Sequence, residues 1–501
     1  MKAHLMYPER DFEPDRELPP QADALTQDLA LDTLFGAMAG DDKFLLQIAR
    51  TALLTAFDNS AEDVRYRQAI LRDCLANAAT IRELYRIALD AVGLEHNVYL
   101  SFMSKYPGTI MHRSMKLLQM QIDMLTRLRR IADSEARRFA SEGFRNLFQL
   151  VRTEISDQYF AELNAHLKQL ELRKGYLISA RLGSLNRGID YCLRQYPPLQ
   201  GSWLRRLFQR KPPAYIYQLA ERDETGATAL SELKDRGVNQ VANAIAQAAD
   251  HITAFFAMLR SELAFYIGCI GLRERLGEMG ADICFPEVDD PPERREDFQG
   301  LYDISLALTM QRPLVGNDLA GDGRHLFIVT GANQGGKSTF LRSIGIAQLM
   351  LQCGMFVPAR RLRANLCDGL FTHYKREEDA GMKSGKLDEE LGRISAIIDR
   401  LSPRSILLCN ESFAATNERE GSEIARQVVR ALAEAGVKLF FVTHLHDFAE
   451  SLYLAPPEGT LFLRAERRDD GERTFRMLEG PPQATAFGRD LYVQVFAEAS
   501  R

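Results

Sequence analysis

The fold of this chain is decided by nine residues near its middle, Gly331-Ala332-Asn333-Gln334-Gly335-Gly336-Lys337-Ser338-Thr339. They fit the pattern G-x-x-x-x-G-K-[ST], in which backbone N–H groups wrap around the phosphates of a nucleotide. In such a loop Lys337 reaches the β- and γ-phosphates, and the hydroxyl of Ser338 holds Mg²⁺. All nine residues are therefore predicted to form a binding site for ATP and Mg²⁺.

The residues on both sides of the loop strengthen this prediction. His325–Thr330 reads as a buried strand before the loop. After it come apolar residues at helical spacing: Phe340, Leu341, Ile344, Ala347 and Leu349. A strand, a glycine loop and a helix in this order bring the positive end of the helix dipole to the phosphates. An incidental glycine-rich turn, the alternative, does not account for this order.

The C-terminal part of the chain alternates between strand and helix patterns. Strands are expected near 325–330, 405–409 and 438–443, and helices near 337–352, 387–401 and 421–435. This alternation predicts a mostly parallel sheet with crossover helices, which is an α/β P-loop NTPase domain.

The strand at 405–409 is followed by Asn410-Glu411, where P-loop ATPases usually carry Asp and then Glu. Asn410 can accept a hydrogen bond from a Mg²⁺-bound water, but it brings no negative charge, so weaker metal binding and slow hydrolysis are expected. Glu411 keeps the role of polarising the attacking water and is a metal candidate as well. An ion pair at a strand end is the alternative role for Glu411.

Two further sites follow from the order of the elements. His444 comes directly after the strand at 438–443, so it is placed to sense a γ-phosphate at the carboxyl edge of the sheet. Ser384-Gly385 opens a helix and can offer a hydroxyl and N–H groups to phosphate. An ordinary helix cap explains Ser384 equally well, and the residues leave both readings open.

Composition bounds the remaining possibilities. The chain has 501 residues, 46% hydrophobic and 26% charged, which fits a protein of two to four domains. Its net charge is −5, so nucleic acid would have to bind to a local basic patch. The seven cysteines form no C-x-x-C pair and indicate a reduced, cytoplasmic protein. No signal peptide or membrane-spanning run is recognised, so no membrane partner is expected.

The N-terminal half is predicted to be helical. Residues 1–22 are proline- and charge-rich and are expected to form an arm. Residues 23–288 show helical periodicity, with long antiparallel helices expected through 109–193, and are predicted to form an all-α domain. Residues 289–300 read as a linker before the ATPase domain at 301–501. Within 199–211, Trp203 stands among arginines and could contact a phosphate backbone, although a solvated loop is the alternative.

The loop, the Ser-Gly turn, the strand with Asn-Glu and the following Thr-His together resemble the ABC-type ATPase domain of the MutS mismatch-repair family. The most similar stretches are TGANQGGKSTFLRSIGIAQLMLQCGMFVPA (330–359), LLCNESFAATNEREG (407–421) and FFVTHLHDFAESL (440–452). The resemblance is strong over about 310–490 and only architectural before that, where the helices are similar to the family's core and lever domain.

The resemblance implies roles for particular residues. Leu314 and Val315 would face adenine, and His444 would contact the γ-phosphate. Ser384 would reach across to the nucleotide of a partner subunit, so a homodimer through the ATPase domain is expected. Three departures from the family are noted: no mismatch-reading domain, little room after residue 490 for a C-terminal dimerisation element, and Asn410 in place of Asp.

The function implied is an ATP-dependent DNA-binding protein in which ATP binding and hydrolysis switch a helical clamp on DNA. DNA repair is the expected setting, as a damage sensor in mismatch repair or in recombination. Branched DNA is favoured over mismatched DNA, because the mismatch-reading domain is missing. Two alternatives stay open at this point. One is an ATPase that holds a protein partner or a ribosome without binding DNA, and the other is a nucleotide switch with negligible turnover.

Overall fold

Two units make up the part of the chain that the structure describes. The structure is a computed structural model that describes residues 1–99, 106–172, 175–195, 215–220, 222–289, 294–376, 385–468 and 472–483. Unit 1 consists of 1–3, 82–139 and 144–260, and unit 2 consists of 4–81, 140–143 and 261–501. The boundaries of the two units fall inside the helical region 23–288. The domain division expected from the sequence uses other boundaries and remains a prediction.

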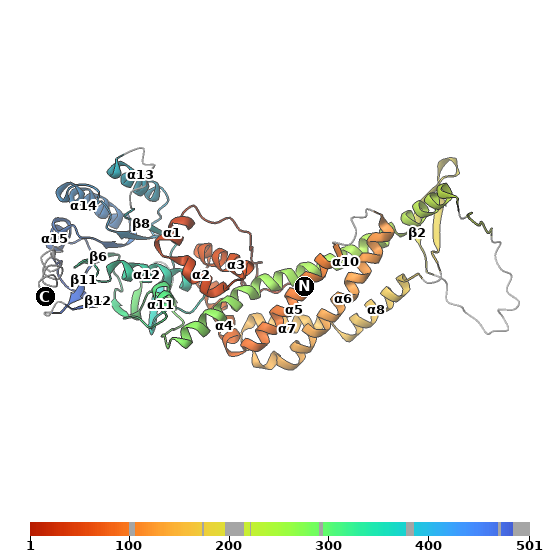
Figure 1. Cartoon of the computed structure of the whole chain (residues 1–501), viewed down its shortest axis with the longest axis horizontal. Coiled ribbons are helices and arrows are strands. Elements are labelled where there is room, and N and C mark those ends of the chain that lie inside the picture. Colours follow the sequence, from red (N-terminus) through yellow and green to blue (C-terminus); the bar gives the residue numbers. More distant parts are fainter. Residues whose placement is uncertain are drawn as a thin grey trace, which may run out of the picture. The chain divides into compact units, whose positions relative to one another are not determined.

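Long helices supply most of unit 1 (Figure 1). They are α5 (Ala78–Tyr99), α6 (Pro107–Glu135), α7 (Glu142–Glu154), α8 (Asp157–Leu170) and α10 (Glu224–Glu278), with a 3-10 turn, η2, at Ala136–Arg138. Apolar residues of α6 that are spaced alternately four and three apart lie on one side of the helix and are buried. They include Met111, Met115, Leu118 and Leu125. Gln121 lies on the same buried side and donates from Nε2 to the Ala249 carbonyl and the Thr253 hydroxyl of α10.

A strand pair corrects the expectation that this region is all-α and that helices run through 109–193. β1 (Ile178–Leu182) and β2 (Gly188–Leu193) pair antiparallel, joined by the short turn η3 (Ser184–Asn186). Gly183 and Gly188 bracket this turn, and such punctuation ends a helix. Residues 215–220 have no regular secondary structure.

Among the described residues one helix, α10, is long and apolar enough to cross a membrane. Within it, 72% of the most apolar 18-residue stretch is buried inside the protein, which is the behaviour of a core helix.

A six-stranded sheet with the order β12-β11-β6-β10-β9-β8 forms the centre of unit 2. Its strands are β6 (Leu326–Thr330), β8 (Leu370–Tyr374), β9 (Ile406–Asn410), β10 (Lys438–Val442), β11 (Thr460–Arg467) and β12 (Arg473–Glu479). All neighbouring strands run parallel except β12, which pairs antiparallel with β11. The strands expected near 325–330, 405–409 and 438–443 are therefore present as β6, β9 and β10, side by side in the sheet.

Helices cover both faces of this sheet. On one face α13 (Lys386–Ile398), α14 (Glu418–Glu434) and α15 (His446–Leu454) pack on alternate strand residues such as Ile328, Cys409 and Phe441. On the other face lies α12 (Lys337–Gln352), which contacts β9 and β10. Because the strands of a parallel sheet end at one edge, the loops after β6, β9 and β10 meet there.

A smaller four-stranded sheet corrects the expected linker at 289–300. It has the order β3-β7-β4-β5, formed by β3 (Glu287–Asp289), β4 (Glu296–Leu301), β5 (Asn317–Ala320) and β7 (Arg361–Asn365). β4 begins inside the stretch 289–300 that was read as a linker and ends one residue beyond it, and its residues Phe298 and Leu301 are buried. The charged run before β4 masked its alternating apolar pattern. The helix α11 (Ile304–Met310) follows β4.

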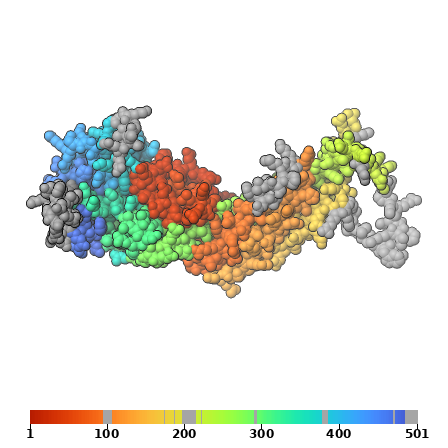
Figure 2. All heavy atoms as spheres, viewed as in Figure 1, coloured from red at the N-terminus to blue at the C-terminus, as the bar shows by residue number. Residues whose placement is uncertain are grey.

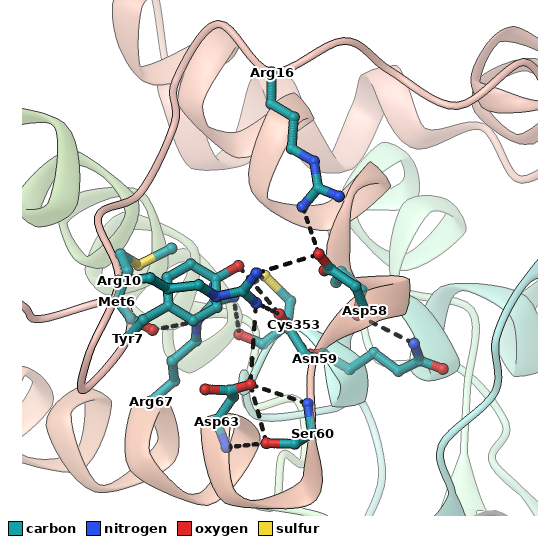
Figure 3. Close-up of polar contacts among 12 residues, drawn as sticks. Met6, Tyr7, Arg10, Arg16, Asp58, Asn59, Ser60, Asp63, Arg67 and Cys353 are labelled. Carbon is teal, nitrogen blue, oxygen red and sulfur yellow. Dashed lines mark hydrogen bonds and ion pairs between the residues drawn. The ribbon is translucent and has the colours of Figure 1, made fainter.

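Residues 4–22, within the stretch 1–22 expected to form an arm, belong to unit 2 and include buried side chains. Leu5 and Met6 are fully buried, and the backbone of Leu5 contacts α10, whose Tyr266 hydroxyl donates to the Leu5 carbonyl at 2.5 Å. Figure 3 shows how Tyr7 and Met6 meet Arg67 in this region. After this segment come α1 (Ala22–Asp28), α2 (Leu31–Ala39), α3 (Lys43–Leu54), η1 (Ala56–Asp58) and α4 (Ala61–Ala76). In Figure 2 these residues, in red to orange, lie beside the green and cyan residues of the same unit.

Candidate functional site

The glycine-rich loop leaves β6 at Thr330 and enters α12 at Lys337. Gly331 has a φ of +117° and Gly336 a φ of +89°, in the left-handed region that favours glycine. A Cβ atom on Gly331 would also lie 2.9 Å from the backbone nitrogen of Ala465, which is too close. The glycines therefore let the loop turn back over the first turn of α12, whose unpaired N–H groups point into the loop.

Lys337 is 4% exposed and holds the loop from inside. Its Nζ atom donates to the carbonyl oxygen of Gly331 at 2.7 Å and to that of Ala332 at 3.0 Å. Burial lowers the pKa of this amine, and the nearby carboxylate of Glu411 acts in the opposite direction. The ammonium group therefore lies among carbonyl oxygens at the place where the pattern puts phosphate oxygens.

Ser338 and Asn410 meet across the edge of the sheet. The Ser338 hydroxyl donates to Oδ1 of Asn410 at 3.0 Å. Asn410 is the last residue of β9 and pairs in register with Val442 of β10 and Tyr374 of β8. A hydroxyl and an amide oxygen, with the Glu411 carboxylate next along the chain, form a set of oxygen donors of the kind that Mg²⁺ prefers. Among the described residues no group of three or more His, Cys, Asp or Glu side chains forms a separate metal site.

Glu411 follows β9 in a turn whose backbone is held to the neighbouring strand. Its N–H donates to the carbonyl oxygen of Val442 at 2.9 Å, and its φ is +55°. Its side chain is half-buried and faces the same cavity as Lys337 and Ser338. The structure thus brings the candidate base to the glycine-rich loop from a strand two positions away in the sheet.

One cavity of about 640 Å³ joins most of the residues predicted from the sequence. It is lined by Asn333–Thr339, Glu411 and the segment that contains Leu314 and Val315. Leu314 is half-buried, whereas Val315 is 45% exposed. Gly331 and Ala332 do not line the cavity, but their carbonyl oxygens accept hydrogen bonds from Lys337, which does. This volume lies in the range of ordinary small-molecule pockets.

Two residues of this cavity region were missed in the sequence. Phe475, on β12, lines the cavity beside the loop with half of its surface exposed and a φ of +59°. Its backbone is fixed by Asn317, which donates to the Phe475 carbonyl at 3.4 Å and accepts from the Met477 N–H at 2.7 Å. Arg473 donates to Oε1 of Gln334 at 2.7 Å. No motif marks either residue, because β12 reaches the loop only through the order of strands in the sheet.

Two predicted residues are not joined to this cavity. His444 is half-buried and is not among the residues that line it. It follows Thr443, whose N–H donates to the Val329 carbonyl at 3.0 Å, so its backbone lies at the same sheet edge as the end of β6. Ser384 lies outside the described residues.

Comparisons with known families match two stretches of the chain. Residues 59–279 match the model of the MutS2 N-terminal domain, and residues 327–488 match that of MutS domain V. The second match begins in β6 and includes the glycine-rich loop, Asn410, Glu411 and His444.

Individual relatives carry the same family name. The DNA mismatch repair protein MutS of Chloroflexus aurantiacus is 34% identical over 176 residues, which is 34% of this chain and 18% of the relative. That of Synechococcus sp. strain CC9902 is 26% identical over 320 residues, 62% of this chain and 34% of the relative. MutS protein homolog 4 of Mus musculus is 29% identical over 158 residues, 31% and 16% of the two chains. The chain thus matches about a sixth to a third of the length of these relatives.

Proposed function

The chain belongs to the MutS family, and from this premise we propose that it is an ATPase that binds DNA and uses ATP to switch a helical clamp on it. The observation that carries the proposal is the joint cavity of the glycine-rich loop, Glu411 and the Leu314–Val315 segment, with Asn410 bonded to Ser338 at its edge. Three separate stretches of sequence meet there in the combination that phosphoryl transfer uses.

The proposed work of each residue follows from its chemistry. Lys337 would exchange its two carbonyl partners for phosphate oxygens, which are stronger acceptors because they are charged. The N–H groups at the start of α12 would bind the same phosphates. Ser338, Asn410 through a water, and Glu411 would hold Mg²⁺, which supplies charge neutralisation at the phosphates when it is bound. Glu411 would accept the proton of the attacking water.

The base of the nucleotide has an apolar site in this proposal. Leu314, Val315 and the ring of Phe475 line the cavity beside the loop, and an aromatic ring with an exposed face favours stacking on a purine. His444 would sense the γ-phosphate from the sheet edge, where the preceding Thr443 bonds to Val329 at the end of β6.

Hydrolysis is proposed to be slow because Asn410 lacks the charge of an aspartate. The direct test is ATP turnover with Mg²⁺ by the purified chain, compared with Glu411→Gln. That substitution should keep ATP binding and leave only a small residual turnover, because the carboxylate acts only when water attacks. Equal turnover by the two proteins would remove Glu411 from the base role.

DNA binding is proposed from family membership and needs a test of its own. Binding through phosphate contacts weakens steeply as salt rises, so the affinity for branched, mismatched and perfect duplex DNA should be measured at several salt concentrations. Branched DNA is expected to bind most tightly. Lack of binding to any DNA at low salt would favour an ATPase that holds a protein partner or a ribosome. The expected cytoplasmic location remains a prediction.

The proposed homodimer would form through the ATPase domain, with Ser384 completing the site of a partner subunit. Sedimentation with Mg²⁺ and a slowly hydrolysed ATP analogue should detect nucleotide-dependent self-association, weakened in Ser384→Ala. A chain that stays monomeric with bound nucleotide at high concentration would contradict this part of the proposal.

A further inference from the structure

Glu411 begins a turn that is strained at two positions. Its φ is +55°, and the φ of Phe413 is +66°, both in the left-handed region that side chains other than glycine rarely adopt. Such conformations persist only where surrounding contacts over-determine them. The contacts of the turn 411–413 therefore decide where the Glu411 carboxylate points.

Ser412, between the two strained residues, is fully buried against β8. Its Oγ atom lies 2.7 Å from Nδ1 of His373 and 2.9 Å from the His373 carbonyl oxygen. Burial, followed by the charge of Arg393, lowers the pKa of His373 to about 4. The neutral ring can carry its proton on Nε2, which then donates to the Glu390 carbonyl at 3.3 Å. The Ser412 hydroxyl donates to the His373 carbonyl oxygen, and Nδ1 is a second acceptor beside it.

Phe413 is held by a carboxylate from another element. Its backbone N–H donates to Oε1 of Glu390 at 2.6 Å, and both residues are buried. Glu390 lies on α13, where Leu391 and Ile394 contribute to the apolar core. A buried carboxylate is unfavourable unless it is hydrogen-bonded, and the Phe413 N–H supplies a hydrogen bond to the Glu390 carboxylate. Arg393, one turn later, donates to the Tyr374 carbonyl at 3.1 Å. Helix α13 is thus hydrogen-bonded both to the last residue of β8 and to the turn that follows β9.

We propose that Glu390 is a positioning residue for Glu411: by binding the Phe413 N–H it fixes the strained turn in the conformation that aims the Glu411 carboxylate into the cavity. This inference rests on the proposed ATPase function. His373 and Ser412 fix the middle of the same turn, and Glu390 touches neither the cavity nor the expected phosphate site. Its loss should therefore change turnover and leave nucleotide binding intact.

The test compares two variants of Glu390 in the full chain. Glu390→Met keeps the length of the side chain and removes the acceptor, and Glu390→Gln keeps an acceptor oxygen. Because a hydrogen bond to a charged group is lost, we expect kcat to fall by about tenfold or more in Glu390→Met. The Kd of a slowly hydrolysed ATP analogue should stay within about twofold. Glu390→Gln should restore most of the rate. Glu389→Gln, an exposed neighbour on α13, is the matched control and should behave as the wild type.

Two further measurements separate positioning from general support. Added to Glu411→Gln, Glu390→Met should lower the residual rate no further, because it acts through Glu411. Amide exchange of peptides containing Phe413, measured without nucleotide, should be faster in Glu390→Met than in Glu390→Gln.

Each outcome bears on the proposal. Wild-type turnover with an unchanged kcat in Glu390→Met overturns the positioning role and leaves the ATPase function standing. A parallel loss of kcat and nucleotide affinity in both variants also overturns it, since that is the result of a purely structural role. A wild type without turnover above the Lys337→Ala background overturns the ATPase function, and the positioning role falls with it.

Discussion

The Ser338 hydroxyl donates to Oδ1 of Asn410 at 3.0 Å, so the loop at the start of α12 is tied directly to the end of β9. In this pair both partners are neutral. An aspartate at position 410 would accept the same hydrogen bond with a full charge, which makes such bonds roughly twice as strong. The pair therefore joins two parts of the candidate site without adding the negative charge that a divalent cation favours.

Asn410→Asp is expected to tighten Mg²⁺ binding and to raise ATP turnover. The added charge should lower the Mg²⁺ concentration at half-maximal turnover by about tenfold, the size expected from one charged hydrogen bond near a metal. Magnesium titration of the ATPase rate measures this. Asn164→Asp, at an exposed position of α8, controls for net charge alone. Equal effects of the two substitutions would place Asn410 away from the metal.

Lys337→Met is expected to abolish measurable ATP binding, because it removes the only lysine or arginine within the loop 331–339. It also removes the donors to the Gly331 and Ala332 carbonyls, so the loop should become more accessible to amide exchange. The substitution removes two hydrogen bonds made by the ammonium group, which is unfavourable, and it removes a buried charge, which is favourable. The free energy of unfolding should therefore change by less than about 2 kcal/mol. Calorimetric titration with ATP and thermal unfolding measure the two effects. ATP affinity at the wild-type level would contradict the assignment of the loop.

The order of strand, loop and helix around Lys337 could be predicted because each part has a local signature. The glycines, the buried strand and the helical spacing are all set by residues within about ten positions. Asn410-Glu411 could be predicted for the same reason, since it directly follows an apolar strand. Leu314 and Val315 came from a family resemblance, and the structure places both in the cavity.

What could not be predicted depends on contacts between distant residues. Phe475 lies on β12, which pairs with β11, and β11 is the neighbour of β6 on the side opposite β10. This strand order brings Phe475 to the loop, and no local pattern encodes it. The buried N-terminal residues were read as an arm because their prolines and charges dominate the composition. Leu5, Met6 and Tyr7 are buried, and their hydrogen-bond partners Tyr266, Arg67 and Asn59 lie 261, 61 and 52 residues away in the sequence. The β1–β2 pair was missed because helical periodicity was extended past Gly175 and Gly183.

Glu262 is expected to make stability depend on pH. Burial raises its pKa from 4.5 to about 7, and its Oε2 atom accepts the Leu5 N–H at 2.5 Å. A carboxyl group whose pKa is higher in the folded than in the unfolded protein stabilises the fold fully below the pKa of the unfolded state. That stabilisation is lost as pH rises through 7, the pKa in the folded state. The difference corresponds to about 3 kcal/mol. Urea unfolding at pH 5 and pH 8 should therefore show that the free energy of unfolding falls more between these pH values in the wild type than in Glu262→Gln. Equal losses would mean that Glu262 is ionised in the folded protein at both pH values.

Arg67 anchors the N-terminal residues to the end of α12 through its guanidinium group (Figure 3). Its Nε donates to the Met6 carbonyl at 2.8 Å and its Nη1 to the Cys353 carbonyl at 3.4 Å. The group lies 4.2 Å from the centre of the Tyr7 ring and is 1% exposed. Cys353 caps α12, so the cation also lies at the negative end of the helix that begins at Lys337.

Arg67→Met is expected to destabilise unit 2 by about 2–4 kcal/mol, because two buried carbonyl groups lose their donors and a desolvated cation–π contact is lost, partly offset by removal of a buried charge. Arg10 supplies a matched control, since its guanidinium group lies 3.8 Å from the centre of the same Tyr7 ring and pairs with Asp58, but is about half exposed. Arg10→Met should cost less than about 1 kcal/mol. Urea unfolding compares the two, and limited proteolysis should cut within the first 20 residues only in Arg67→Met. Equal destabilisation would mean that the Tyr7 ring, rather than the buried guanidinium, fastens the N-terminal residues; faster cleavage without a change in the unfolding midpoint would instead show that these residues detach without loosening α12.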